Sequence, residues 1–184
     1  MIGHKGFLQV GRELCAVLAF TLAMGTAVPG FAAVMADKFK PGDKAPDFTL
    51  KNLAKTDVSL SSFAGKSVVL LNFWGLRCGA CLEEMPYLQK ISDSYKDKGL
   101  VVIGVDTDGV DPDEVIATLK EVEVSVPYTL LVDPDFKVTD VYTNFLVPLT
   151  IVIDMSGTIQ YIHTGFEKGN EKLYEDAVRK ALGI

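Results

Sequence analysis

The sequence lacks an excess of positive charge, internal repeats and low-complexity tracts. Its formal net charge is −6, from 18 basic and 24 acidic residues among 184. Phosphate binding needs a basic face, so this balance argues against a nucleic-acid partner. Hydrophobic residues make up 48% of the chain, which excludes intrinsic disorder, and the length suits one ordinary domain with a sizeable core.

Cysteine is scarce as well. There are three, and one of them, Cys15, falls in an apolar N-terminal stretch. Without that stretch the chain keeps Cys78, Cys81 and one histidine, His163. Structural zinc needs four nitrogen or sulfur ligands, so we expect no metal. A disulfide that closes so short a loop would stabilise the fold little. A redox pair is the favoured interpretation, and two packed thiols are the alternative.

A long hydrophobic run is also missing. The apolar run at 14–28 is shorter than the roughly 18–20 residues that a membrane-spanning helix needs. Lys5 and Arg12 precede it, and small residues follow it. This pattern predicts a secretory signal peptide at 1–36 and a domain at 37–184, in the periplasm or another extracytoplasmic compartment. The alternative is an uncleaved anchor, in which residues 14–28 tether the protein to a membrane.

Hydrophobic periodicity predicts an α/β domain with a mixed central sheet flanked by helices. The expected order of elements is β-β-β-α-β-α-β-α-β-β-α. The continuous apolar run from Ser67 to Trp74 suits a strand that is buried on both faces. A helix should begin near Cys78 and end near Gly99, and Asn170 should cap the last helix.

The C-x-x-C pair falls where the buried strand meets this helix. Free N–H groups and the helix dipole would stabilise a thiolate on Cys78, which makes it the attacking group. Cys81 lies one turn further on, on the apolar stripe of the helix, which suggests a buried resolving thiol. The spacing therefore predicts that Cys78 attacks a partner and that Cys81 releases it.

The segment "NFWGLRCGACLEEMP" resembles the active site of thioredoxin-like thiol–disulfide oxidoreductases. The similarity is to exported TlpA/ResA-type proteins of the redoxin (AhpC/TSA-like) superfamily, and it runs from about Ala45 to the C-terminus. "KAPDFTLKN" matches an N-terminal β-hairpin that these proteins add to the thioredoxin-like fold. "VPLTIVID" matches the family's cis-proline segment, which implies that Pro148 and Val147 shape a substrate groove beside the cysteines. Trp74 is expected to belong to this groove as well, packed beneath the site, and an ordinary core role is the alternative.

The resemblance implies a function as well as a fold. It predicts a dithiol/disulfide exchange with protein substrates, carried out by a redox-active Cys78–Cys81 disulfide without a metal or organic cofactor. Electrons would come from a membrane dithiol donor. In the family, reductive roles are common, often in cytochrome c maturation, and we therefore expect a reductant. The alternative is an oxidant, because Arg77 next to Cys78 would stabilise the thiolate and raise the reduction potential.

Two charged residues flank the pair. Glu84 should face the core side of the helix with Cys81, whereas its neighbour Glu83 should face solvent. An acid on the core side suggests proton transfer to and from Cys81, and the resemblance agrees; the alternative is an acid favoured by the helix dipole. Arg77 stands where the family usually has tryptophan, so it should either favour the thiolate of Cys78 or remain a screened surface charge. Leu146 replaces a glycine of the family's cis-proline segment.

Two other functions compete with the oxidoreductase. The start "APDFTL" also occurs in peroxiredoxins, but their P-x-x-x-T-x-x-C pattern would need proline and threonine where this chain has Leu71 and Gly75. A thiol peroxidase is therefore the more distant alternative. A non-catalytic thioredoxin-fold binding module is the other, and the intact cysteine pair argues against it.

Overall fold

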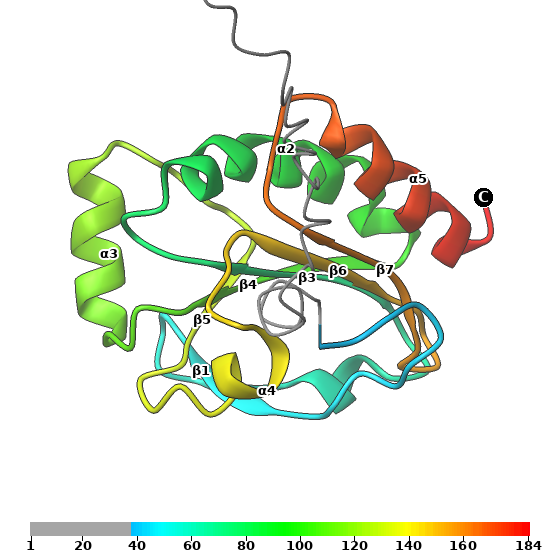
Figure 1. Ribbon diagram of the computed structural model, residues 1–184, viewed down its shortest axis with the longest axis horizontal. Coiled ribbons are helices and arrows are strands. Elements are labelled where there is room, and N and C mark those ends of the chain that lie inside the picture. Colours follow the sequence, from blue (N-terminus) through cyan, green and yellow to red (C-terminus); the bar gives the residue numbers. More distant parts are fainter. Residues whose placement is uncertain (1–37) are drawn as a thin grey trace, which may run out of the picture.

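The structure is a computed structural model that describes residues 38–184 (Figure 1). The expected signal peptide or anchor at 1–36, with the proposed tether at 14–28, lies outside the described residues. Within the described range, no helix combines the length and the apolar character needed to cross a membrane.

A seven-stranded mixed sheet forms the centre of the molecule, in the order β2-β1-β5-β4-β3-β6-β7 (Figure 1). The strands are β1 (Thr49–Asn52), β2 (Asp57–Ser59), β3 (Val68–Trp74), β4 (Leu100–Asp106), β5 (Thr129–Val132), β6 (Leu149–Ile153) and β7 (Ile159–Thr164). β4 pairs in parallel with both β3 and β5, whereas β6 is antiparallel to β3. The carboxyl ends of β3, β4 and β5 therefore lie at one end of the sheet.

Helices cover both faces of the sheet (Figure 1). The helical elements are η1 (Leu60–Phe63), α2 (Gly79–Tyr95), η2 (Lys96–Lys98), α3 (Pro112–Glu121), α4 (Thr139–Tyr142) and α5 (Asn170–Leu182). The core residues of α2, α3 and α5 pack with one face of the sheet, and those of α4 and η1 with the other. The observed order of strands and helices confirms the order predicted from the sequence.

Strand β3 is the most buried part of the sheet. All seven of its side chains are buried, as a run that is apolar apart from Asn72 predicts. Leu70 and Trp74 belong to the core on the α2 side, and Leu71 and Phe73 to the core on the α4 side. Because β3 leads directly into the cysteine segment, the site begins at a rigid, central strand.

Helix α2 buries the stripe that the sequence predicts. The apolar positions at spacings of three and four are all buried: Cys81, Met85, Leu88, Ile91 and Tyr95. The helix passes into the short η2, and Gly99, with φ of 96°, ends this helical stretch in the left-handed conformation that glycine favours. The stripe fixes which side of α2 faces the sheet.

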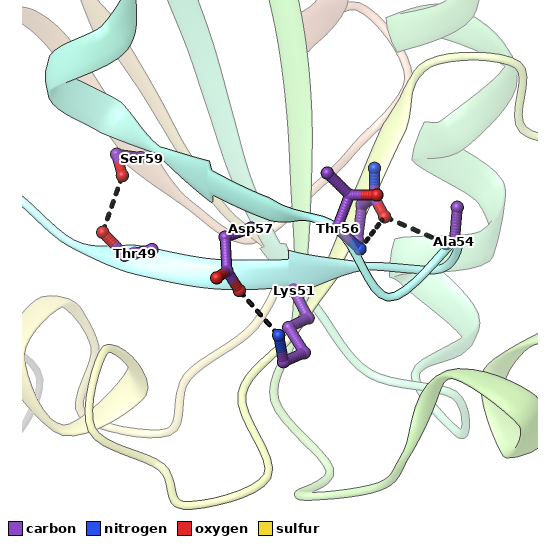
Figure 2. A network of polar contacts seen from close by, with 7 residues as sticks. Thr49, Lys51, Ala54, Thr56, Asp57 and Ser59 are labelled. Atoms are coloured by element: carbon purple, nitrogen blue, oxygen red, sulfur yellow. Dashed lines mark hydrogen bonds and ion pairs between the residues drawn. The ribbon is translucent and has the colours of Figure 1, made fainter.

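The N-terminal strands β1 and β2 form the expected hairpin. Its turn is closed by the Asn52 side chain, whose Oδ1 accepts the N–H groups of Ala54 and Thr56 at 3.0 and 2.9 Å (Figure 2). Across the two strands, Lys51 pairs with Asp57 at 2.8 Å, directly opposite it in the register (Figure 2). β1 also pairs with β5, so the hairpin extends the main sheet.

The prediction that Asn170 caps the last helix is wrong. Gly169 is the N-cap of α5, with φ of 111°, and its N–H donates to the side chain of Glu171 at 2.7 Å. The side chain of Asn170 instead lies 2.9 Å from Nε2 of His163, on β7. The side-chain amide that the local sequence pattern assigned to the N-cap of α5 thus contacts His163 on another element instead.

Candidate active site

The loop between β3 and α2 is held by a carboxylate from the neighbouring strand end. Oδ2 of Asp108 accepts the backbone N–H of Leu76. A Cβ placed on the buried Gly75 would lie only 3.1 Å from the same oxygen. Glycine at position 75 therefore lets the chain pass close to Asp108, and this contact fixes the approach to the cysteines.

The two cysteines have different environments at the start of α2. Cys78 is the N-cap residue, half-buried and extended, and its Sγ accepts the backbone N–H of Cys81 at 3.2 Å. Cys81 is only 1% exposed and packs in the core. The two sulfurs form a disulfide. This placement puts a reachable sulfur in the field of the helix N-terminus and a shielded one behind it.

The segment before β6 lies against the reachable sulfur. The peptide bond between Val147 and Pro148 is cis, the isomer that the resemblance implies. The carbonyl oxygen of Val147 lies 3.8 Å from Sγ of Cys78. Pro148 is buried, and Val147 is half-buried. The structure therefore brings both residues to the cysteines, and their part in binding substrate stays a prediction.

Trp74 ends β3 four residues before Cys78. Its side chain is fully buried and packs in the same core cluster as both cysteines. The indole lies over Gly104 of β4, where an added Cβ would be 3.2 Å from Nε1. Trp74 thus lies within the core at this end of the sheet and has no exposed surface with which to line a groove.

Glu84 is fully buried and hydrogen-bonded. Its Oε2 accepts from Nδ2 of Asn72 at 2.8 Å, and its Oε1 accepts from the hydroxyl of Thr150 at 3.0 Å. Burial raises the pKa of Glu84 to about 7, against the opposing effect of hydrogen bonds from Thr150, Tyr174 and Asn72. Both protonation states of this carboxyl are therefore accessible near neutral pH, which suits a group that exchanges protons.

The neighbouring acid faces the other way, as the helical spacing predicts. The side chain of Glu83 is 52% exposed and pairs with Lys168 at 3.3 Å. Because Glu84 shares the buried stripe with Cys81 and Glu83 does not, only Glu84 can act inside the site. Its role in proton transfer stays a prediction.

Arg77 is exposed next to Cys78. It lines a surface hollow of about 230 Å³ together with Leu76, Asp108, Val110 and Glu114. Two carboxylates therefore share this hollow with one guanidinium. The expected effect of Arg77 on the thiolate of Cys78 stays a prediction.

The residues that hold Glu84 were not predicted from the sequence. Asn72 and Thr150 lie opposite each other on β3 and β6, and Asn72 donates to both Glu84 and the Thr150 hydroxyl. Each is a polar residue inside an otherwise apolar strand, and this was a usable signal. Tyr174, fully buried on α5, carried no such signal because a tyrosine in an amphipathic helix is ordinary core.

A second buried carboxyl was also missed. Asp106 ends β4 directly opposite Trp74, and its Oδ1 accepts the N–H of Asp108 at 3.1 Å. Burial, followed by the proximity of Asp108 and Glu114, raises its pKa to about 7. The site is therefore flanked by a buried acid on each of two neighbouring elements, Glu84 on α2 and Asp106 on β4.

Nothing between residues 38 and 184 resembles a metal site. No group of three or more His, Cys, Asp and Glu side chains in that range is placed to hold a metal ion.

Comparison with known proteins gives one family. The model of the AhpC/TSA family matches residues 41–162. The thiol-disulfide oxidoreductase ResA of Bacillus thuringiensis subsp. konkukian is 31% identical over 146 residues, which cover 79% of each chain. The thioredoxin-like protein YneN of Bacillus subtilis is 36% identical over 124 residues, 67% of this chain and 71% of its own.

Solved structures agree with the sequence relatives. A Chlorobium tepidum protein described as the thiol:disulfide interchange protein DsbE has a TM-score of 0.72 at 32% identity, with 79% of this chain and 99% of that chain covered. The thioredoxin domain of a thiol-disulfide oxidoreductase from Bacteroides vulgatus has a TM-score of 0.61 at 29% identity, with 76% and 99% covered. The fold is thus thioredoxin-like, and the chain belongs to the AhpC/TSA family as a TlpA/ResA-type thiol–disulfide oxidoreductase.

Proposed function

We propose that this protein works outside the cytoplasm as a reductant of protein disulfides, with the Cys78–Cys81 pair as its redox group. The observation that carries the thiol–disulfide exchange is the asymmetry of the pair. Cys78 is half-buried at the N-cap of α2, and Cys81 is 1% exposed behind it. A partner can therefore reach one sulfur, while the other is kept for the second step.

The exchange has two steps. In the first, the Cys78 thiolate attacks one sulfur of a substrate disulfide, and the other substrate sulfur leaves as a thiolate. In the second, Cys81 gives up its proton and attacks Sγ of Cys78, which releases the remaining substrate thiolate. Two electrons pass to the substrate, and the Cys78–Cys81 disulfide is left to be reduced by a dithiol donor.

Glu84 is proposed to accept the proton that Cys81 loses. It lies three residues after Cys81 on the same buried stripe of α2. With its pKa raised to about 7, the ionised form is available as a base near neutral pH, and the acid form can return the proton. Asn72 and Thr150 hold the carboxylate oxygens in place.

The reducing direction and the setting rest on the leader pattern and the family. An exported reductant must work where disulfides persist, and it therefore needs electrons from a membrane dithiol donor. The ResA relatives are named as thiol-disulfide oxidoreductases, which supports protein thiols as substrates. In the family that this chain resembles, such reductants often act in cytochrome c maturation, and we propose that pathway for this protein.

Reduction of insulin disulfides tests the chemistry. We expect the wild type to catalyse it, Cys78→Ser to lose at least about a hundredfold in rate, and Cys81→Ser to accumulate a mixed disulfide visible by mass spectrometry. Glu83→Gln changes an exposed side chain of the same helix; it serves as the control and should reduce insulin at the wild-type rate. Unchanged activity in Cys78→Ser would refute Cys78 as the attacking group, and a wild type without activity would favour a non-catalytic binding module.

Export is tested separately. Residues 1–36 alone, and in a second fusion the full-length chain, can be joined to a reporter enzyme that is active only outside the cytoplasm. We expect reporter activity from both fusions, and two inactive fusions would contradict an extracytoplasmic location. Membrane fractionation of the full-length chain then distinguishes a released protein from one tethered through residues 14–28.

A further inference from the structure

A pair of phenylalanines, Phe145 exposed and Phe136 half-buried, lies close in sequence to the cis proline. Phe145 is 59% exposed, more than any other large hydrophobic side chain in residues 38–184. Its ring centroid lies 6.2 Å from that of Phe136. Both residues have positive φ, 58° for Phe145 and 57° for Phe136, a conformation that bulky side chains rarely adopt and that clusters at functional sites. We call Phe136 and Phe145 the aromatic ledge.

The loops hold this ledge in place. The N–H of Phe145 donates to the Thr143 hydroxyl at 2.9 Å, and the N–H of Phe136 donates to the carbonyl of Asp133 at 3.0 Å. A Cβ on Gly109 would lie 2.2 Å from the Phe136 ring, so the loop after β4 is closely packed against it. An exposed apolar surface that is fixed by its surroundings is a docking feature rather than a defect of packing.

The ledge is continuous with the reacting sulfur. Phe145 precedes Val147 by two residues, and the carbonyl oxygen of Val147 lies 3.8 Å from Sγ of Cys78. A polypeptide whose cysteine reaches Cys78 therefore approaches the segment 145–148, in which Phe145 is the exposed aromatic residue. The established activity thus supplies the occupant of this surface, which is a protein substrate.

The other flank of the site is acidic. Between Asp106 and Asp140 the chain has ten acidic and two basic residues, whereas the remaining described residues carry a slight excess of positive charge. Figure 1 shows α3, from this segment, at the end of the sheet where α2 begins. The hollow beside Arg77 is lined here by the carboxylates of Asp108 and Glu114 and by the apolar side chain of Val110.

The loop at 108–110 joins the two features. Gly109 faces Phe136 of the ledge, and its neighbours Asp108 and Val110 line the acidic hollow. We propose that the ledge and the hollow together select protein substrates whose reactive cysteine has an apolar side chain on one side and a lysine or arginine on the other. The basic side chain would lay its stem along Leu76 and Val110 and turn its charge toward the carboxylates.

This inference rests on the proposed function, and peptide disulfides test it. Peptides with one cysteine, linked through a disulfide to the coloured thiol thionitrobenzoate, report attack by Cys78 as thionitrobenzoate is released. Four peptides differ only in the flanking residues: Leu with Lys, Ser with Lys, Leu with Glu, and Ser with Glu. Hydroxyethyl disulfide, which has no flanking side chains, measures the intrinsic reactivity of the site.

We expect the reduced wild type to react about tenfold faster with the Leu/Lys peptide than with the Ser/Glu peptide. Phe145→Ser should lose the preference for Leu, whereas Met155→Ser, at an exposed apolar residue in the turn between β6 and β7, should keep it. Glu114→Lys should lose the preference for Lys, whereas Asp97→Lys, an equal charge reversal after the far end of α2, should keep it. The controls Met155→Ser and Asp97→Lys should reduce hydroxyethyl disulfide at the wild-type rate, and the peptide rates of Phe145→Ser and Glu114→Lys are each divided by that variant's own rate on hydroxyethyl disulfide.

Three outcomes would overturn the inference. Equal wild-type rates for all four peptides would remove the selectivity itself. Equal losses of Phe145→Ser on peptides and on hydroxyethyl disulfide would mean damage to the site. A concentration-dependent dimer that Phe145→Ser abolishes, without peptide selectivity, would make the ledge a contact between copies of this chain. A wild type that reacts with no disulfide at all would instead refute the proposed function on which the inference rests.

Discussion

Replacing the buried acid by its amide should change how stability depends on pH. Glu84 is fully buried, and its pKa in the folded protein is raised from the ordinary 4.5 to about 7. Glu84→Gln keeps the shape of the side chain and an oxygen that can accept from Asn72 or Thr150, but it cannot ionise. The variant therefore isolates the cost of burying the charge.

The sign follows from which state holds the proton. Between about pH 4.5 and pH 7 the unfolded chain has released the Glu84 proton while the folded protein retains it, so stability falls as pH rises. Above about pH 7 both states are ionised, and the loss is complete. A shift of this size corresponds to about 3 kcal/mol. Glu84→Gln should lack this fall.

The measurement is the free energy of unfolding by urea, with the disulfide intact, at intervals from pH 4 to pH 8.5. We expect the difference between Glu84→Gln and the wild type to move in favour of the variant by about 3 kcal/mol across this range. Glu83→Gln is the matched control, because that side chain is half-exposed, and its difference should stay nearly constant. Parallel curves for Glu84→Gln and the wild type would refute the buried, proton-holding carboxyl.

Three further substitutions probe other parts of the account. Asp111→Ala removes the oxygen that accepts the N–H groups of Asp113 and Glu114 at the start of α3, and it should lower the free energy of unfolding by about 1 kcal/mol in urea titrations. Gly109→Ala adds a Cβ at φ of 73° and 2.2 Å from the Phe136 ring, and it should cost about 2 kcal/mol; an unchanged urea midpoint would contradict the packing of that loop. Arg77→Ala should move the pH dependence of Cys78 alkylation in the reduced protein to higher pH, and an unmoved profile would make Arg77 a surface charge only.

Much of the architecture could be predicted because it depends on local pattern. The alternation of apolar runs and amphipathic stretches gave the correct order of strands and helices, and the spacing along α2 separated buried Glu84 from exposed Glu83. The same spacing placed Cys78 at the helix start and Cys81 on the buried stripe. These features depend on residues within one or two turns of each other.

The parts that could not be predicted depend on contacts between distant segments. Asn72, Thr150 and Tyr174 meet around Glu84 from β3, β6 and α5, and no local periodicity brings them together. The local sequence pattern predicts that the side-chain amide of Asn170 caps the last helix, but this amide contacts His163 on β7 instead. Likewise, Phe145 adopts a left-handed loop conformation, and a phenylalanine in the sequence does not predict that conformation.

The reduction potential of the Cys78–Cys81 pair tests the proposed reductant most directly. The protein is equilibrated with mixtures of reduced and oxidised glutathione, and the fraction of dithiol is read by alkylation and mass spectrometry. We predict a value closer to that of thioredoxin, about −270 mV, than to that of the strong oxidant DsbA, about −120 mV. A value near −120 mV would contradict the account, because such a pair would introduce disulfides into its partners rather than remove them.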